Sequence, residues 1–273
     1  MQVKKVLLII CSAVLFIQTA SAEPAQQAAN NIKTVNHAFG PGEKLTYDVS
    51  WSNILRAGIA VMDIKEGRTN EGRRTYQFVS STHTVGMVDA FYTVRDTVVS
   101  EVDAENISSL SFMLKESHGK RKREREMTFD QGTNKVKVIV NKGKPETYPV
   151  PEGVVDALSS LYYLRTRQDF STEKPIIVDV HDSGKTWAVE IQTLGKEKIS
   201  TPAGEFNTIK VKTYPKYDGV FMHKGEIFIW LTDDSRKIPV LMKSKISIGS
   251  IVATLTGIQT GGAPPAETGG ATN

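Results

Sequence analysis

Apolar and polar residues alternate along most of the chain. In the first such segment, Leu45, Tyr47, Val49 and Trp51 are separated by polar neighbours. The same period of two returns, with turn residues between the segments, at 76–78, 92–98, 110–114, 136–140, 187–191 and 251–255. This alternation predicts β-strands that bury one face, and their close spacing is typical of antiparallel hairpins. We therefore expect roughly a dozen antiparallel strands.

One segment departs from this period. Asp156 can cap the start of a helix, and Leu158, Leu161, Tyr162 and Arg165 follow at helical spacing. This pattern predicts one short amphipathic helix near residues 156–167, with its apolar face against the sheet.

The number of strands favours a curved architecture. A sheet of this size twists until it curls or closes. Ile227–Leu231 is apolar at every position, so this strand should be covered on both faces. We predict an all-β fold: a large antiparallel, strongly curved sheet or a closed β-barrel. A two-lobed arrangement, divided near residue 150, is the alternative.

The N-terminal segment predicts export. Lys4 and Lys5 precede an apolar run from Val6 to Ile17, and small residues follow up to Ala22. This order is typical of a secretory signal peptide, so we expect residues 1–22 to be removed after Ala22 and the protein to reach the periplasm.

The rest of the chain divides by composition. Residues 23–38 are polar and rich in Ala, Gln and Asn, and residues 259–273 are rich in Gly, Pro, Ala and Thr. Both lack the apolar residues of a packed core, so we expect a flexible lead-in and a disordered tail. Residues 39–258 would then form a single β-rich domain.

Cysteine content and charge exclude several classes of protein. The one cysteine, Cys11, lies in the predicted signal peptide, within an apolar run that disfavours a lipid anchor. A net charge of +4 without a concentrated basic face excludes a nucleic-acid partner. After signal cleavage we expect no transmembrane span. An outer-membrane barrel is a weaker alternative, because many strands are short and no aromatic girdles bracket them.

Several short stretches together resemble an exported bacterial family, Domain of Unknown Function 3108. The stretches are Gly42–Tyr47, Ala57–Gly58, Phe91–Asp96, Asp156–Arg165, Thr201–Phe206 and Trp230–Asp234. The resemblance covers about residues 40–258. It implies a β-rich protein of the cell envelope and brings no catalytic residues.

Motifs for catalysis or metal binding are missing from the sequence. There is no G-x-S-x-G, H-E-x-x-H, C-x-x-C or phosphate-binding glycine loop. The histidines follow no metal-ligand spacing; they are His37, His83, His118, His181 and His223. Asp233–Asp234 and His181–Asp182 lie in sequences typical of turns. We therefore expect no catalytic residue, metal or cofactor, and a protein that is not an enzyme.

The densest charge cluster begins after His118. In a strand, Arg121, Arg123 and Arg125 would share one face with Met127 and Phe129. Guanidinium groups that continue an apolar face suit an amphiphile with an anionic head. The alternative is a charged strand that discourages edge-to-edge aggregation.

Three functions remain open. The first is a non-catalytic periplasmic protein that binds or carries an apolar or amphiphilic ligand inside a curved sheet. Its candidate ligand-binding residues are Arg121, Arg123, Arg125, Tyr92 and Trp230. The second is a structural or interaction module of the envelope with a filled core. The third is a hydrolase of envelope polymers.

Overall fold

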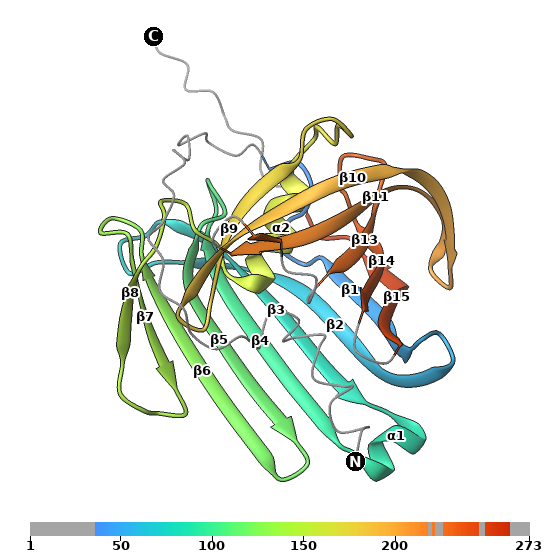
Figure 1. Ribbon diagram of the computed structural model, residues 1–273, viewed down its shortest axis with the longest axis horizontal. Helices are drawn as coiled ribbons and strands as arrows, with labels where there is room; N and C mark the ends of the chain where they lie inside the picture. The colour runs from blue at the N-terminus through green and yellow to red at the C-terminus, as the bar shows by residue number, and fades with distance from the viewer. Residues whose placement is uncertain (1–35, 218–219, 222–225, 246–248, 263–273) are drawn as a thin grey trace.

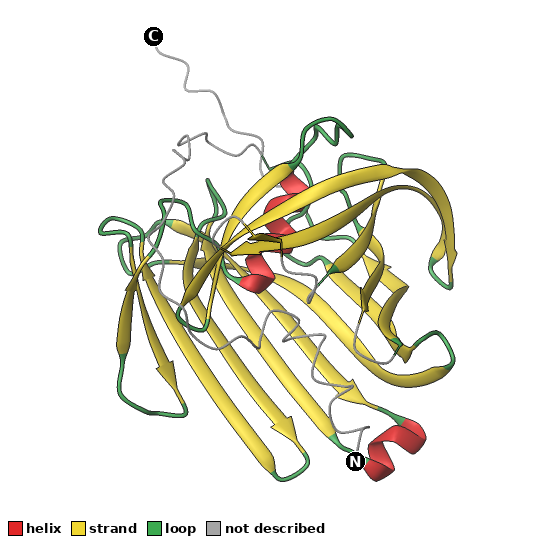
Figure 2. Ribbon diagram, viewed as in Figure 1, coloured by secondary structure: helices red, strands yellow, loops and turns green. Residues whose placement is uncertain are grey.

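The computed structural model describes residues 36–217, 220–221, 226–245 and 249–262. The predicted signal peptide and residues 263–273 of the predicted tail lie outside these ranges. Within them the strands form one 15-stranded antiparallel sheet (Figures 1 and 2). The strands are β1 (Lys44–Trp51), β2 (Leu55–Arg68), β3 (Arg74–Thr84), β4 (Val94–Asp103), β5 (Ser109–His118), β6 (Arg121–Asp130), β7 (Lys135–Val140), β8 (Glu146–Pro149), β9 (Ile176–Asp182), β10 (Lys185–Thr201), β11 (Gly204–Tyr217), β12 (Val220–Phe221), β13 (Ile227–Thr232), β14 (Pro239–Lys245) and β15 (Ser250–Gln259).

The strand order explains the curvature. Neighbours follow the order β8-β7-β6-β5-β4-β3-β2-β1-β15-β14-β13-β11-β10-β9, and β12 pairs with β11. The first and last long strands, β1 and β15, pair in the middle of this order and join both halves of the chain. The prediction of a large, strongly curved antiparallel sheet is confirmed. The sheet does not close, because β8 and β9 form its two edges.

The alternation seen in the sequence sets which face is buried. In β1, Leu45, Tyr47 and Val49 are buried, and the residues between them are more exposed. Tyr47 lies opposite Ala60 of β2 and Leu255 of β15, so three apolar residues share one face. Repeated across the sheet, this register makes the concave face apolar.

The predicted helix is confirmed as α2 (Ala157–Thr166), between β8 and β9. Oδ1 of Asp156 accepts hydrogen bonds from the backbone N–H groups of Leu158 (2.8 Å) and Ser159 (3.0 Å). Its Oδ2 accepts from the hydroxyls of Ser100 (2.5 Å) and Ser109 (2.6 Å) on the sheet. This buried carboxylate therefore caps the helix and attaches it to β4 and β5.

The far end of α2 is held by a buried ion pair. Arg165 donates to both carboxylate oxygens of Glu43, at 2.6 and 2.8 Å. Its guanidinium carbon also lies 5.1 Å from the ring centre of Phe39 and 5.4 Å from that of Tyr162. Glu43 immediately precedes β1, so the pair fixes α2 to the start of the sheet.

The helix fills the concave side of the sheet. Tyr162 stacks on Phe78 of β3, with 3.7 Å between ring centres. Leu158 packs against the apolar cluster of β1–β3 and β13–β15 and also against that of β4–β7. Leu161 packs against the first of these clusters and against the cluster of β9–β13. The three clusters therefore meet at α2.

The two edges of the sheet approach each other without pairing. Val155, just before α2, donates from its N–H to the carbonyl of Asp179 (3.0 Å), and its carbonyl accepts from His181 N–H (2.8 Å). The neighbouring Val154 carbonyl accepts from the N–H of Ser109 on β5 (3.2 Å). This segment links β5 to β9 across the opening.

A second helix, α1 (Gly86–Phe91), connects β3 and β4 and was not expected from the sequence. It has six residues and buries none of them, so it leaves no apolar period in the sequence. Within the described residues, neither helix is long and apolar enough to cross a membrane.

Candidate anion-binding site

The three arginines predicted to bind a ligand have different surroundings. Arg125 is buried on the concave face, where it forms an ion pair with Asp182 of β9 (2.5 Å) and contacts the hydroxyl of Ser183. Arg123 is half-buried and lies 4.0 Å from Glu116 of β5. Arg121 is exposed at the start of β6. Two of the three guanidinium groups are therefore paired with carboxylates of the protein.

Tyr92 lies near the start of this arginine row, whereas Trp230 does not. The Tyr92 ring is 6.5 Å from that of His118, which lies opposite Arg121 in the register. Trp230 is on β13, and seven strands of the sheet order separate β13 from β6. Its indole N–H donates to Glu197 (2.6 Å). The structure does not bring the five predicted residues together.

The concave face becomes polar at the α1 end of β4 and β5. Nε2 of His118 lies 2.9 and 2.8 Å from the two carboxylate oxygens of Asp96, and both side chains are buried. The hydrogen bond to Asp96 raises the pKa of His118. A buried pair of this kind stabilises the strand ends when the imidazole is protonated.

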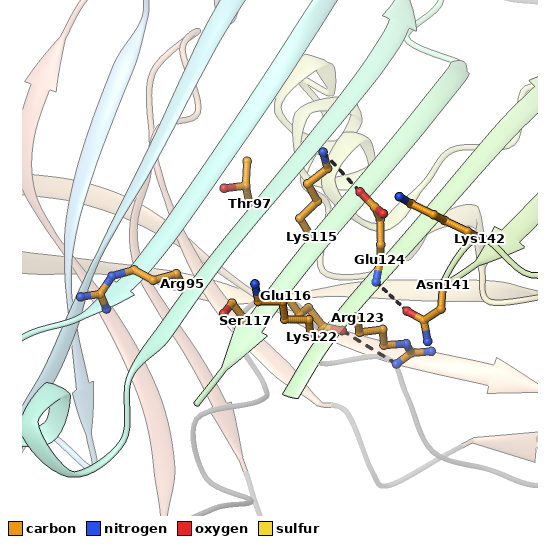
Figure 3. Close-up of a pocket in the computed structure, with 10 residues that line it drawn as sticks. All are labelled: Arg95, Thr97, Lys115, Glu116, Ser117, Lys122, Arg123, Glu124, Asn141 and Lys142. Carbon is orange, nitrogen blue, oxygen red and sulfur yellow. Dashed lines mark hydrogen bonds and ion pairs between the residues drawn. The ribbon is translucent and has the colours of Figure 1, made fainter. Parts of the chain in front are cut away.

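A basic pocket of about 430 Å³ lies at the same end of the sheet (Figure 3). Thr97, Lys115 and Glu124 occupy positions that alternate with the buried residues, so they project from the convex face. Glu116 and Arg123 belong to the other set of positions, which faces the concave side, and their charges cancel. The lining residues are Arg95, Thr97, Lys115, Glu116, Ser117, Lys122, Arg123, Glu124, Asn141 and Lys142.

The pocket carries an excess of positive charge. Five of its lining residues are cations and two are carboxylates, which gives a net charge of +3. Lys115 pairs with Glu124 at 3.3 Å, and Arg95 pairs with Asp89 of α1 at 2.8 Å. Lys122 and Lys142 form no ion pair with the residues that the structure describes, so their charges are available to a ligand.

The β7–β8 turn positions the edge of the pocket. Asn141 and Lys142 both have positive φ, at 51° and 57°, and Gly143 N–H closes the turn on the Val140 carbonyl (2.8 Å). Glu124 N–H donates to Oδ1 of Asn141 (2.9 Å). Because Oδ1 is used in this way, the amide N–H₂ of Asn141 is free to donate elsewhere.

These groups suit an oxyanion. Two ammonium groups, an amide and the hydroxyls of Thr97 and Ser117 can donate to a phosphate or carboxylate. Among the described residues that line the pocket there is neither histidine nor cysteine, so the lining lacks the commonest general base and thiol nucleophile.

A second polar cluster lies between the edges of the sheet. His181 is fully buried; its Nδ1 is 2.9 Å from the Thr186 hydroxyl, and its Nε2 has no partner among the described residues. Burial, together with the nearby charge of Arg125, lowers its pKa to about 4. Within the described part of the chain, no group of three or more His, Cys, Asp or Glu side chains could hold a metal ion.

Sequence reasoning missed part of the basic pocket. Alternation along β6 does separate Lys122 and Glu124 from the arginine row. Lys142, however, comes from a turn after β7, and the pairing of β6 with β7 that brings it to Lys122 is not visible in either segment alone. The one signal in the sequence was the run of lysines and glycine after Asn141.

The geometry defines an open, curved β-sheet protein with a basic pocket on its outer face. The chain belongs to the family described as Protein of unknown function (DUF3108), whose model matches residues 46–256. This match confirms the resemblance noted in the sequence.

One solved structure supports the fold. The chain resembles a β-barrel-like protein of Domain of Unknown Function DUF1849 from Brucella abortus, with a TM-score of 0.56 and 12% identity over 82% of this chain and 100% of that one. It is also similar to a candidate exported protein with a YmcC-like fold from Bacteroides fragilis (TM-score 0.35, 11% identity, 82% and 99% coverage). A candidate lipoprotein from Parabacteroides distasonis gives a TM-score of 0.36 at 10% identity, with 84% and 100% coverage. No curated protein matches the sequence.

Proposed function

We propose that this protein is a non-catalytic binding protein of the bacterial cell envelope, and that its basic pocket holds the anionic group of an amphiphile. The observation that carries the proposal is the excess of cations around the pocket, where Lys122 and Lys142 have no carboxylate partner among the described residues. Of the arginines predicted to bind a ligand, Arg123 is among the residues that line this pocket and stays in the proposed site, whereas Arg121 is not among them.

The envelope location rests on the sequence. The charged start, apolar run and small residues of positions 1–22 have the order of a signal peptide. Cell fractionation tests this part of the proposal. We expect the protein in the periplasm with its N-terminus at Glu23, and an unprocessed cytoplasmic protein would contradict it.

The filled interior favours a ligand on the outer face. A carrier that encloses an apolar chain needs room between the sheet and α2, but Tyr162 stacks directly on Phe78 there. On the concave face, the guanidinium of Arg125 is likewise already paired with Asp182 and is not available to a ligand. The same filling favours the second candidate function, an interaction module that binds an envelope protein.

A hydrolase has less support. Asp234 accepts hydrogen bonds from the Thr232 hydroxyl (2.6 Å) and from the N–H groups of Arg236 (3.0 Å) and Lys237 (3.2 Å), which is turn chemistry. The pair of His118 with Asp96 is buried and uses both carboxylate oxygens.

Titration calorimetry with inorganic phosphate and with dodecyl phosphate tests the pocket. We expect the double variant Lys122→Gln/Lys142→Gln to bind dodecyl phosphate about tenfold more weakly, a loss of roughly 1.4 kcal/mol. The matched control is Lys135→Gln/Lys137→Gln, which removes two exposed lysines of β7 outside the pocket. Equal affinity of both double variants, or no binding by the unmodified protein, would contradict the proposal.

A further inference from the structure

We propose that the α1 end of the sheet docks on a bilayer that contains anionic lipids. The surface that would enter the bilayer interface is an apolar tip formed by Ile54, Leu55, Met87 and Phe91. The apolar tip includes no residue of the basic pocket. The positive charge beside it shares Lys122 and Lys142 with the pocket, so the test below changes only residues outside the pocket.

The apolar tip is exposed to an unusual degree. Phe91 is 86% exposed, Ile54 82% and Met87 74%, and Leu55 beside them is 44% exposed. Single exposed apolar residues are ordinary, but a group of them at one end of a protein marks an interaction surface. Two adjacent connections supply the group, the β1–β2 turn and α1, and Val85 N–H joins them by donating to the Ala57 carbonyl (3.1 Å).

The orientation of α1 is fixed by polar contacts on its inner side. Met87 and Phe91 are four residues apart and share one face of the helix. Asp89, on the opposite face, accepts from the Thr84 hydroxyl (2.6 Å) and from Arg95 (2.8 Å). The helix is therefore attached through Asp89, and its two large apolar side chains are directed away from the sheet.

Positive charge lies along the same edge. In Figure 1 the β5–β6 hairpin ends near α1 at the bottom of the view, and the β7–β8 hairpin ends on the far side of it, at the lower left. They carry four exposed lysines, which are Lys120, Lys122, Lys142 and Lys144. At the opposite end of β2 and β3, two cations are paired with carboxylates: Arg73 with Glu71 (3.4 Å) and Arg74 with Glu66 (2.8 Å).

This combination fits a lipid surface better than a protein. Exposed lysines are depleted at protein interfaces, whereas apolar side chains flanked by lysines are typical of segments that lie in a membrane interface. Lysine side chains are long enough to reach lipid phosphates while the apolar tip enters the headgroup region. Charge complementarity therefore points to phosphatidylglycerol or a similar anionic lipid.

Vesicle co-sedimentation tests the proposal with the mature chain from Glu23. We expect binding to vesicles of phosphatidylcholine with phosphatidylglycerol, weaker binding to phosphatidylcholine alone, and weakening by salt. Met87→Ser/Phe91→Ser should reduce binding to the anionic vesicles by about tenfold or more. Lys120→Gln/Lys144→Gln should reduce it on anionic vesicles only.

The control variant is Ile177→Ser/Leu194→Ser, which removes two other exposed apolar residues, 50% and 46% exposed, from β9 and β10. It should bind vesicles like the unmodified protein. All variants should keep the melting temperature within about 2 °C, because the changed side chains are on the surface. Absence of vesicle binding by the unmodified protein, or an equal loss in the control, would overturn the proposal; in the first case a protein partner becomes the better occupant.

Discussion

His181 shows how a single buried residue can make this fold sensitive to acid. Its ring lies 6.2 Å from that of Phe129 and 6.0 Å from that of Tyr148, and its Nε2 has no hydrogen-bond partner among the described residues. A protonated ring there would place a second positive charge beside Arg125. The folded protein therefore holds His181 in its neutral form.

The pKa of His181 is lowered to about 4, from an ordinary value of about 6.5. The unfolded chain thus binds a proton on this histidine below about pH 6.5, while the folded chain does so only near pH 4. Above pH 6.5 the neutral His181 does not lower the free energy of unfolding. As the pH falls from 6.5 toward 4, the free energy of unfolding drops by about 3 kcal/mol in total. Urea unfolding at a series of pH values measures this loss.

His181→Phe should remove this part of the acid sensitivity, because phenylalanine fits between aromatic rings and has no proton to bind. His37→Gln, at an exposed histidine, is the control and should leave the pH profile unchanged. If His181→Phe loses stability with acid as steeply as the unmodified protein, another group is responsible.

At the scale of elements, α2 depends on its two ends. Asp156 holds the first turn and Glu43 holds the last, through Arg165. Removing one partner of a buried ion pair leaves the other charge without compensation in the core. We therefore expect the packing of α2 to be destabilised most by substitution of Glu43, a residue outside the helix itself.

Glu43→Gln should lower the free energy of unfolding by about 3–5 kcal/mol, because Arg165 stays charged and loses its carboxylate. Denaturant unfolding measures this loss, with the exposed neighbour Lys44→Gln as control. The double variant Glu43→Leu/Arg165→Met should lose less than Glu43→Gln, since neither charge remains buried. A loss below about 1 kcal/mol for Glu43→Gln would show that water or another group replaces the carboxylate.

The elements that the sequence predicted are those with local signals. Alternation identified strands such as β1, and the Asp156 cap with apolar residues at helical spacing identified α2. In contrast, α1 has too few residues for a period, and Arg165 reaches Glu43 across 122 positions of sequence. The sequence did not predict the basic pocket because its residues are also distant along the chain: Lys142 comes near Lys122 only when β6 and β7 pair.

At the scale of the whole molecule, side-chain contacts bring the sheet edges together, in addition to the two backbone hydrogen bonds of Val155 with β9. Arg125 of β6 reaches Asp182 of β9, and Tyr148 of β8 packs over the β9–β10 turn. A methyl group added to Gly184 in that turn would lie 2.7 Å from Cζ of Tyr148. The curvature of the sheet should therefore depend on the volume of the side chain at position 184.

Gly184→Ala tests this dependence against a matched position. Gly184 and Gly72 both sit in hairpin turns with positive φ, at 83° and 84°, but a methyl group on Gly72 would meet no atom within 4 Å. Alanine has the same backbone strain at either position. The difference in unfolding free energy between the two variants therefore measures the contact with Tyr148. Gly184→Ala should lower the free energy of unfolding by about 1 kcal/mol more than Gly72→Ala does. In a Tyr148→Ala background the two substitutions should cost the same, because the opposing ring is gone. An excess cost for Gly184→Ala that persists without the ring would mean that the turn itself, and not the meeting of the two edges, resists the added volume.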